Sequence, residues 1–210
     1  MSLLVRGARV VTASDDYVAD VFADGETITA IARDLPVEAD VVLEGHGLLL
    51  LPGGVDPHVH LDFPFGATKT SDSVRTGTVA AALGGTTTVV NFAQQLPGES
   101  LQATLDKALV NAAGEAAVDY GIHLIVTGLD DQTLPDLAAV AGEGVTSVKL
   151  FMAYPGTVMV DDGTLFQVLE RTGEVGALTC VHAENGDVID VLARRALAAG
   201  RTGPSWHSRT

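Results

Sequence analysis

The stretch GVDPHVHL, residues 54–61, decides how the rest of the chain is interpreted, because it is the first of five short apolar runs that alternate with segments of helical spacing. Strands that are nearly continuously apolar are buried on both faces, which indicates a parallel sheet covered by helices. We expect Ser71 to cap the first helix and Gly84-Gly85 to end it. The other strands are expected at 86–92, 118–127, 147–152 and 177–182, and the helices at 71–83, 101–113, 134–141, 164–172 and 188–199.

Two architectures fit this alternation: a doubly wound sheet and a β/α barrel. A nucleotide-binding doubly wound sheet carries a glycine-rich loop after its first strand. This chain has His58-Val59-His60-Leu61-Asp62 at that place, so the doubly wound alternative lacks its main feature.

Residues 1–52 follow a different pattern of short, β-branched runs. Asp24-Gly25 is a strong hairpin signal, since both turn positions tolerate a positive φ. Gly7 is expected to break the first strand, 3–11, and His46 is interpreted as a surface or turn histidine. A small β unit without chemistry of its own therefore precedes the alternating part.

Composition sets outer limits on the function of the 210-residue chain. Its 47% hydrophobic residues allow a substantial core, and its net charge of −15 argues against a nucleic-acid partner, which needs clustered lysine and arginine. No run approaches the ~20 apolar residues of a membrane span, and no signal peptide is recognisable. Cys180 is the single cysteine, so no intrachain disulfide can form, and a cytoplasmic location is expected.

The sharpest chemical signal is the pair His58 and His60. Residues two apart on a strand point to the same side, so these imidazoles aim at one point. Neutral imidazole is a common ligand of divalent metals, and a barrel gathers its active site at the carboxyl ends of its strands. The alternative is two unrelated histidines.

Lys149 and His182 lie in later strands of the same series. A buried ammonium is costly, so Lys149 either extends its amine past the strand end to water or keeps a neutral amine that can add CO2 to form a carbamate. His182 ends the fifth strand and is either a metal ligand or a core histidine. Convergence of three strand ends on one mouth favours a metal site.

Tyr154 follows Lys149 on a loop marked by Pro155-Gly156. Its phenol could donate a hydrogen bond to a developing oxyanion, or the ring could simply pack at the loop root. His123 lies in the middle of a strand and is interpreted as structural.

Four stretches together resemble the dihydropyrimidinase/hydantoinase branch of the amidohydrolase superfamily. The chain is similar to that branch along essentially its whole length, with the motifs in the family's order. These stretches are PGGVDPHVHLDFPFGATKTSDS (52–73), GTVAAALGGTTTVVNFA (77–93), VKLFMAYPG (148–156) and HAENGDVID (182–190), followed by GRTGPSWHSRT (200–210).

The resemblance implies a partial (β/α)8 TIM barrel of about five of eight units in residues 53–210, preceded by part of a β-sandwich in residues 1–52. It implies two divalent metal ions, with zinc expected, and a CO2-derived carbamate on Lys149 that bridges them. His58 and His60 match ligands of the more buried metal, and His182 matches a ligand of the second. Tyr154 matches the tyrosine that hydrogen-bonds the substrate carbonyl. The positions that match the substrate pocket are Phe63, Phe65 and Phe151.

The implied reaction is hydrolysis of a small cyclic amide, a dihydropyrimidine or hydantoin, to an N-carbamoyl amino acid. The family's remaining ligands lie on later strands, so we expect this chain to be a fragment of a product about twice as long and inactive alone. The full-length protein is expected to be a homotetramer or homodimer. Asn91 departs from the acid of many relatives.

Two alternatives stay open. An allantoinase or dihydroorotase would carry an arginine soon after the histidine pair, whereas Leu61–Gly66 lacks one. A non-catalytic scaffold like the collapsin-response mediator relatives would have lost metal ligands, whereas this chain keeps every ligand that its length could hold.

Overall fold

A computed structural model describes residues 1–130 and 133–210 of the chain, which divides into two compact units, Met1–Gly54 and Val55–Thr210. None of the described helices combines the length and the apolar character that a membrane crossing requires. Each unit has a sheet of its own.

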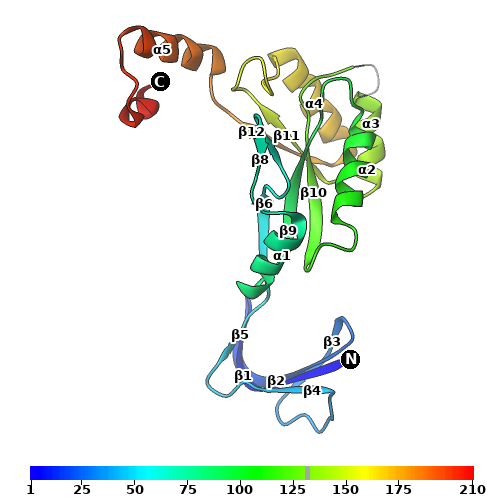
Figure 1. Ribbon diagram of the computed structural model, residues 1–210. Coiled ribbons are helices and arrows are strands. Elements are labelled where there is room, and N and C mark those ends of the chain that lie inside the picture. The colour runs from blue at the N-terminus through cyan, green and yellow to red at the C-terminus, as the bar shows by residue number, and fades with distance from the viewer. Residues whose placement is uncertain (131–132) are drawn as a thin grey trace. The chain divides into compact units, whose positions relative to one another are not determined.

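The first unit is a five-stranded mixed sheet in which β1 is central (Figure 1). The predicted hairpin at Asp24-Gly25 is confirmed, because β2 and β3 pair antiparallel and Gly25 has a φ of 60°. The predicted break at Gly7 is wrong. The strand continues through Gly7 with a β-bulge, since its φ of 63° absorbs the register shift between Val5 and Ala8. The strands are β1 (Ser2–Val11), β2 (Asp16–Asp24), β3 (Thr27–Ala32), β4 (Val41–Glu44) and β5 (Leu49–Leu50).

The second unit confirms the predicted alternation and the partial barrel. Its five main strands form one sheet in the order β12-β11-β10-β9-β6, and each is followed by a helix. The strands are β6 (Gly54–Val59), β9 (Thr86–Gln94), β10 (Asp119–Ile125), β11 (Ser147–Phe151) and β12 (Leu178–His182). The helices are α1 (Val74–Leu83), α2 (Leu101–Ala112), α3 (Thr133–Gly142), α4 (Asp162–Val175) and α5 (Gly186–Ala198). A short hairpin of β7 (Pro64–Phe65) and β8 (Thr68–Lys69) and a final 3-10 helix, η1 (Pro204–Arg209), complete the unit.

The two faces of this sheet have different roles. Figure 1 shows α2, α3 and α4 along one side of the sheet. Alternate residues Ile122, Leu124, Val148 and Leu150 join the helices in the main hydrophobic core. Because neighbouring residues on a strand point to opposite faces, His123 and Lys149 belong to the other face, called the inner face below.

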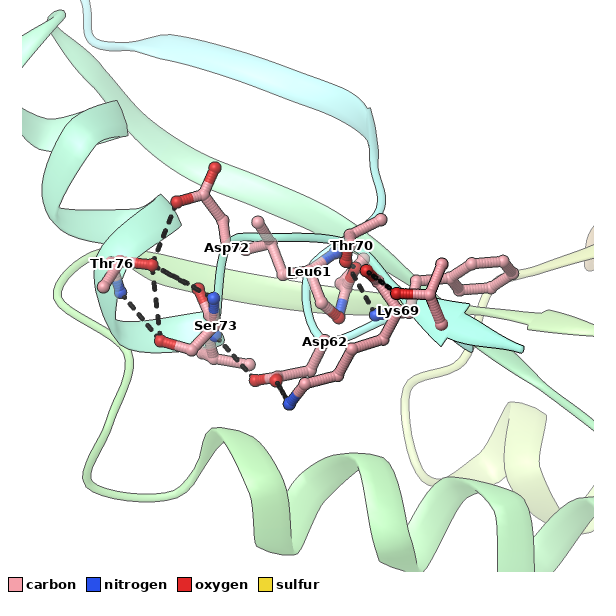
Figure 2. A network of polar contacts seen from close by, with 11 residues as sticks. Leu61, Asp62, Lys69, Thr70, Asp72, Ser73 and Thr76 are labelled. Carbon is pink, nitrogen blue, oxygen red and sulfur yellow. Dashed lines mark hydrogen bonds and ion pairs between the residues drawn. The ribbon is translucent and has the colours of Figure 1, made fainter. Parts of the chain in front are cut away.

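Helix α1 begins later than predicted. Ser73, not Ser71, is its N-cap: the Ser73 hydroxyl accepts from the Thr76 amide, and the Thr76 hydroxyl accepts from the Ser73 amide (Figure 2). Residues before Ser73 are held in the preceding loop instead, since the Asp72 carbonyl accepts from the Asp62 amide at 2.9 Å. The capping box therefore fixes where the loop ends and the helix starts.

Candidate metal centre

The two histidines at the end of the first barrel strand, β6, lie against one phenylalanine. The ring centroids of His58 and His60 are 5.2 Å apart, and they lie 4.6 and 4.8 Å from that of Phe92 on β9. Phe63 packs edge-on against His60 with centroids 4.6 Å apart. Phe92 also contacts His123, so the histidine pair gathers on the inner face of the sheet.

His60 has an unsatisfied polar atom. Its Nδ1 is buried and, among the described residues, has no hydrogen-bond partner, which ordinarily costs about 1–3 kcal/mol. Burial lowers the pKa of His60, and the nearby positive charges of His58 and Lys149 lower it further. The ring is therefore neutral near pH 7, which is the form that binds a metal.

Lys149 is buried in the middle of β11, with 9% of its surface exposed. In the part of the chain that the structure describes, its Nζ makes no hydrogen bond or ion pair and lies 5.0 Å from the centre of the Phe151 ring. Burial lowers the pKa of Lys149 from its ordinary value of 10.5. A lowered pKa increases the neutral fraction of the amine, the form able to add CO2.

A second group of side chains surrounds the end of β12. The His182 ring lies 5.5 Å from Phe151 and 5.4 Å from Tyr154, centroid to centroid. Its Nε2 lies 2.6 Å from Glu184 Oε2 and donates to that carboxylate oxygen; in the neutral ring, Nδ1 then carries the lone pair. Tyr154 is half exposed and has a φ of 67°, so a left-handed backbone turn carries it past the strand end.

The structure thus brings the candidates together as two groups rather than one. His58 and His60 form the first, and Lys149, Tyr154 and His182 lie along β11 and β12. Among residues 1–130 and 133–210, no three side chains of His, Cys, Asp or Glu are close enough to hold a metal ion. The groups are nevertheless in electrostatic contact, because the charge of Lys149 reaches His60.

The candidate pocket phenylalanines have unequal surroundings. Phe63 and Phe151 contact His60 and His182 respectively. Phe65 is 74% exposed at the β7–β8 hairpin, and no ring contact connects it with a candidate ligand among the described residues. Only the first two therefore adjoin the candidate ligands in this structure.

Sequence reasoning missed the network that holds the loop after His60 (Figure 2). Asp62 binds Lys69 Nζ at 2.8 Å and accepts from the Val74 amide at 3.0 Å, and these contacts lower the pKa of its carboxyl group. Asp62 has a φ of 51°, a backbone conformation that aspartate tolerates better than most residues. The sequence offers one signal for this ion pair: an acid and a lysine stand seven residues apart, on either side of the turn residues 64–66.

Comparison with known proteins identifies the family. The model of the amidohydrolase family matches residues 49–203. The chain belongs to the amidohydrolase family. Within the family, the chain is similar along nearly its whole length to dihydropyrimidinases and D-hydantoinases, as the following relatives show.

A dihydropyrimidinase structure from Brevibacillus agri superposes with a TM-score of 0.94 at 51% identity, covering 99% of this chain and 45% of that one. The D-hydantoinase of Streptomyces coelicolor is 46% identical over 97% of this chain and 45% of its own length. That of Geobacillus stearothermophilus is 44% identical over 100% of this chain and 45% of its own length. The chain therefore spans a little under half the length of these amidohydrolases.

Proposed function

We propose that this amidohydrolase chain contributes to a site that hydrolyses a cyclic amide, opening dihydropyrimidine or hydantoin rings to N-carbamoyl amino acids. The site would hold two divalent metal ions, with zinc as the expected metal. The chain's proposed ligands are His58, His60, the carbamate of Lys149, and His182.

One observation carries the proposal: the Nδ1 atom of His60 is buried and, among the described residues, has no hydrogen-bond partner. Native proteins rarely leave a buried polar atom unpaired, so this nitrogen suits a site completed by an external group. Lys149 supports the proposal, because its side chain is buried on the same face and burial lowers the pKa of its amine. The donor set of imidazole and carbamate oxygen matches what zinc binds. The residues present therefore fit the metal pair that the family implies.

Each of the chain's proposed site residues would then have a separate role in the reaction. The neutral Lys149 Nζ would form a bond to the carbon of CO2 as one C–O π bond opens, and would release a proton to water, which creates a carboxylate on a long stem. When bound, the metal pair would lower the pKa of water and polarise the ring carbonyl. Tyr154 would donate a hydrogen bond to the carbonyl oxygen as negative charge develops there. Phe63, Phe65 and Phe151 would shape the pocket around the ring's side group.

The proposal extends to the wider organisation of the protein. Residues 1–52 would form part of a β-sandwich and residues 53–210 the first part of the barrel domain, and the unit boundary at Gly54 supports this division. A cytoplasmic homotetramer or homodimer is proposed for the full-length protein, and the single cysteine agrees with a reducing compartment.

The direct test is ring opening by the full-length protein loaded with zinc. Dihydrouracil and hydantoin are expected to be hydrolysed, and the Lys149→Ala variant is expected to lose turnover by at least about 1000-fold, because metal-assisted charge stabilisation is worth several kcal/mol. Turnover of dihydroorotate or allantoin alone would favour the alternative substrates. Purification without stoichiometric metal, and no turnover of any ring, would favour a non-catalytic scaffold.

A further inference from the structure

His58 and His60 lie at the end of β6, His58 as its fifth residue and His60 directly after the strand. A metal ion needs its ligands in one geometry, so the main chain that carries them must be held in place. Two side chains from other strands of the sheet bond to that main chain.

The first anchor is Asn91 on β9. Its Oδ1 accepts from the Leu61 amide at 2.9 Å, and its Nδ2 donates to the Leu61 carbonyl at 3.2 Å. An amide side chain can make both bonds at once, whereas an ionised carboxylate could only accept. The Leu61 side chain also packs against Gly77 of α1, where a Cβ would lie 2.3 Å from Leu61 Cδ2. Leu61 is therefore fixed through both its backbone and its side chain.

The second anchor is His123 on β10, which reaches past β9 to β6. Its Nε2 lies 2.8 Å from the carbonyl oxygen of Pro57, and its Nδ1 contacts the hydroxyl of Ser147 on β11. A carbonyl only accepts, so Nε2 carries the proton and donates to Pro57. In the neutral ring, Nδ1 then accepts from Ser147. His123 thereby connects β6 with β11, the strand of Lys149.

The two anchors flank the candidate ligands in sequence: Pro57 immediately precedes His58, and Leu61 immediately follows His60. We propose that Asn91 and His123 are positioning residues that hold the main chain of residues 57–61, so that the imidazoles of His58 and His60 meet a metal ion in one fixed geometry. This inference rests on the proposed function, because it assigns a role at the same site. It also accounts for the polar side chain of Asn91 between the apolar residues Val90 and Phe92.

Zinc affinity of the full-length protein, measured by competition with a chromophoric chelator, tests the inference without an activity assay. Asn91→Leu removes both bonds to Leu61, and Asn91→Asp keeps only the acceptor. His123→Gln keeps a donor near the Nε2 position, whereas His123→Asn keeps a polar group only near Nδ1. The matched control is Thr78→Val, because Thr78 is buried and its hydroxyl accepts from the backbone amide of Ala117, as Asn91 Oδ1 accepts from that of Leu61. His60→Ala serves as the reference for loss of a ligand.

We expect Asn91→Leu and His123→Asn to weaken zinc binding by about 10-fold or more, the range seen when residues that orient metal ligands are removed. His123→Gln should recover most of the affinity, Asn91→Asp should be intermediate, and Thr78→Val should bind like the wild type. This order of affinities would show that the bond to Pro57 and the two bonds to Leu61 maintain zinc binding. If Asn91→Leu does not fold, the milder Asn91→Asp and the glutamine and asparagine variants of His123 carry the comparison.

Two results would overturn the inference while leaving the metal assignment intact. In the first, Asn91→Leu and His123→Asn bind zinc like the wild type although His60→Ala does not. In the second, Thr78→Val weakens binding as much as they do, which would indicate general loss of stability. Wild-type zinc affinity in His60→Ala contradicts the proposed function itself, and the positioning roles with it.

Discussion

Strands β11 and β6 both carry candidate metal ligands, but they are held in opposite ways. The first four residues of β11, including Lys149, are buried, whereas the first five of β6, including His58, are exposed. β11 lies between β10 and β12, and β6 lies at the end of the sheet order. Apolar packing therefore fixes Lys149, while hydrogen bonds from neighbouring strands fix the histidine pair.

The difference explains how one site can contain groups with different electrostatic requirements. Burial on β11 lowers the pKa of an amine that must be neutral to react with CO2. Around β6, bonds from Asn91 and His123 hold the main chain on either side of His58 and His60. The following substitutions distinguish the packing that holds β11 from the hydrogen bonds that hold the segment around β6, from the largest expected effect to the smallest.

Removing packing should matter far more on β11 than on β6. Leu150 is fully buried, so Leu150→Ala is expected to lower the free energy of unfolding by about 2–5 kcal/mol. Val55 on β6 is 63% exposed, so Val55→Ala should change the free energy of unfolding by no more than about 0.5 kcal/mol. Urea unfolding of both variants measures the contrast. Equal losses would show that β6 is packed as firmly as β11.

Burial of Lys149 should cost stability. Lys149→Met keeps an unbranched apolar side chain of similar length and is expected to raise the free energy of unfolding of the metal-free chain by about 1 kcal/mol. The folded pKa of Lys149 is below its ordinary value of 10.5, so the unfolded state binds more protons between the two values. Wild-type stability should therefore rise with pH through that window, and the methionine variant should lack this rise. Identical pH profiles would contradict the burial account.

The Asp62 network should contribute least, because Lys69 is 67% exposed. Asp62 has a lowered pKa, so its contribution is complete above its ordinary value of 3.8 and is lost as the pH falls through the folded value. Asp62→Asn should remove this acid dependence and cost about 1 kcal/mol or less at neutral pH. Thermal unfolding at several pH values tests this, with the exposed Glu38→Gln as control. A loss as large as that of Leu150→Ala would show that the loop supports the whole unit.

Much of the fold could be predicted because its signals are local. The mostly apolar run Ser147–Phe151 predicts a buried strand. The glycines at 84–85 predict the end of a helix, because their backbone adopts turn conformations easily. The start of α1 was misplaced because Ser71 and Ser73 are both capable caps. Ser73 forms the capping box with Thr76, and the bond between the Asp62 amide and the Asp72 carbonyl keeps the preceding residues in the loop. Such a choice depends on a contact across the loop, which sequence periodicity does not encode.

The candidate site could be predicted less completely. The residue types of His58, His60 and Lys149 indicated chemistry, but the bonds of Asn91 and His123 join residues 30 and 66 positions apart. His123 was interpreted as structural from its position in the middle of a strand. The structure shows where its two ring nitrogens bind, and hence which strand it holds.

The central claim is that Lys149 carries a carbamate in a zinc site that His60 completes. Nuclear magnetic resonance of the full-length protein, supplied with carbon-13-labelled bicarbonate and zinc, tests this most directly. We predict a carbamate carbonyl resonance that requires zinc, is absent in Lys149→Met and is strongly reduced in His60→Ala. A zinc-loaded, active protein without that resonance, or one in which Lys149→Met retains it, would contradict the account.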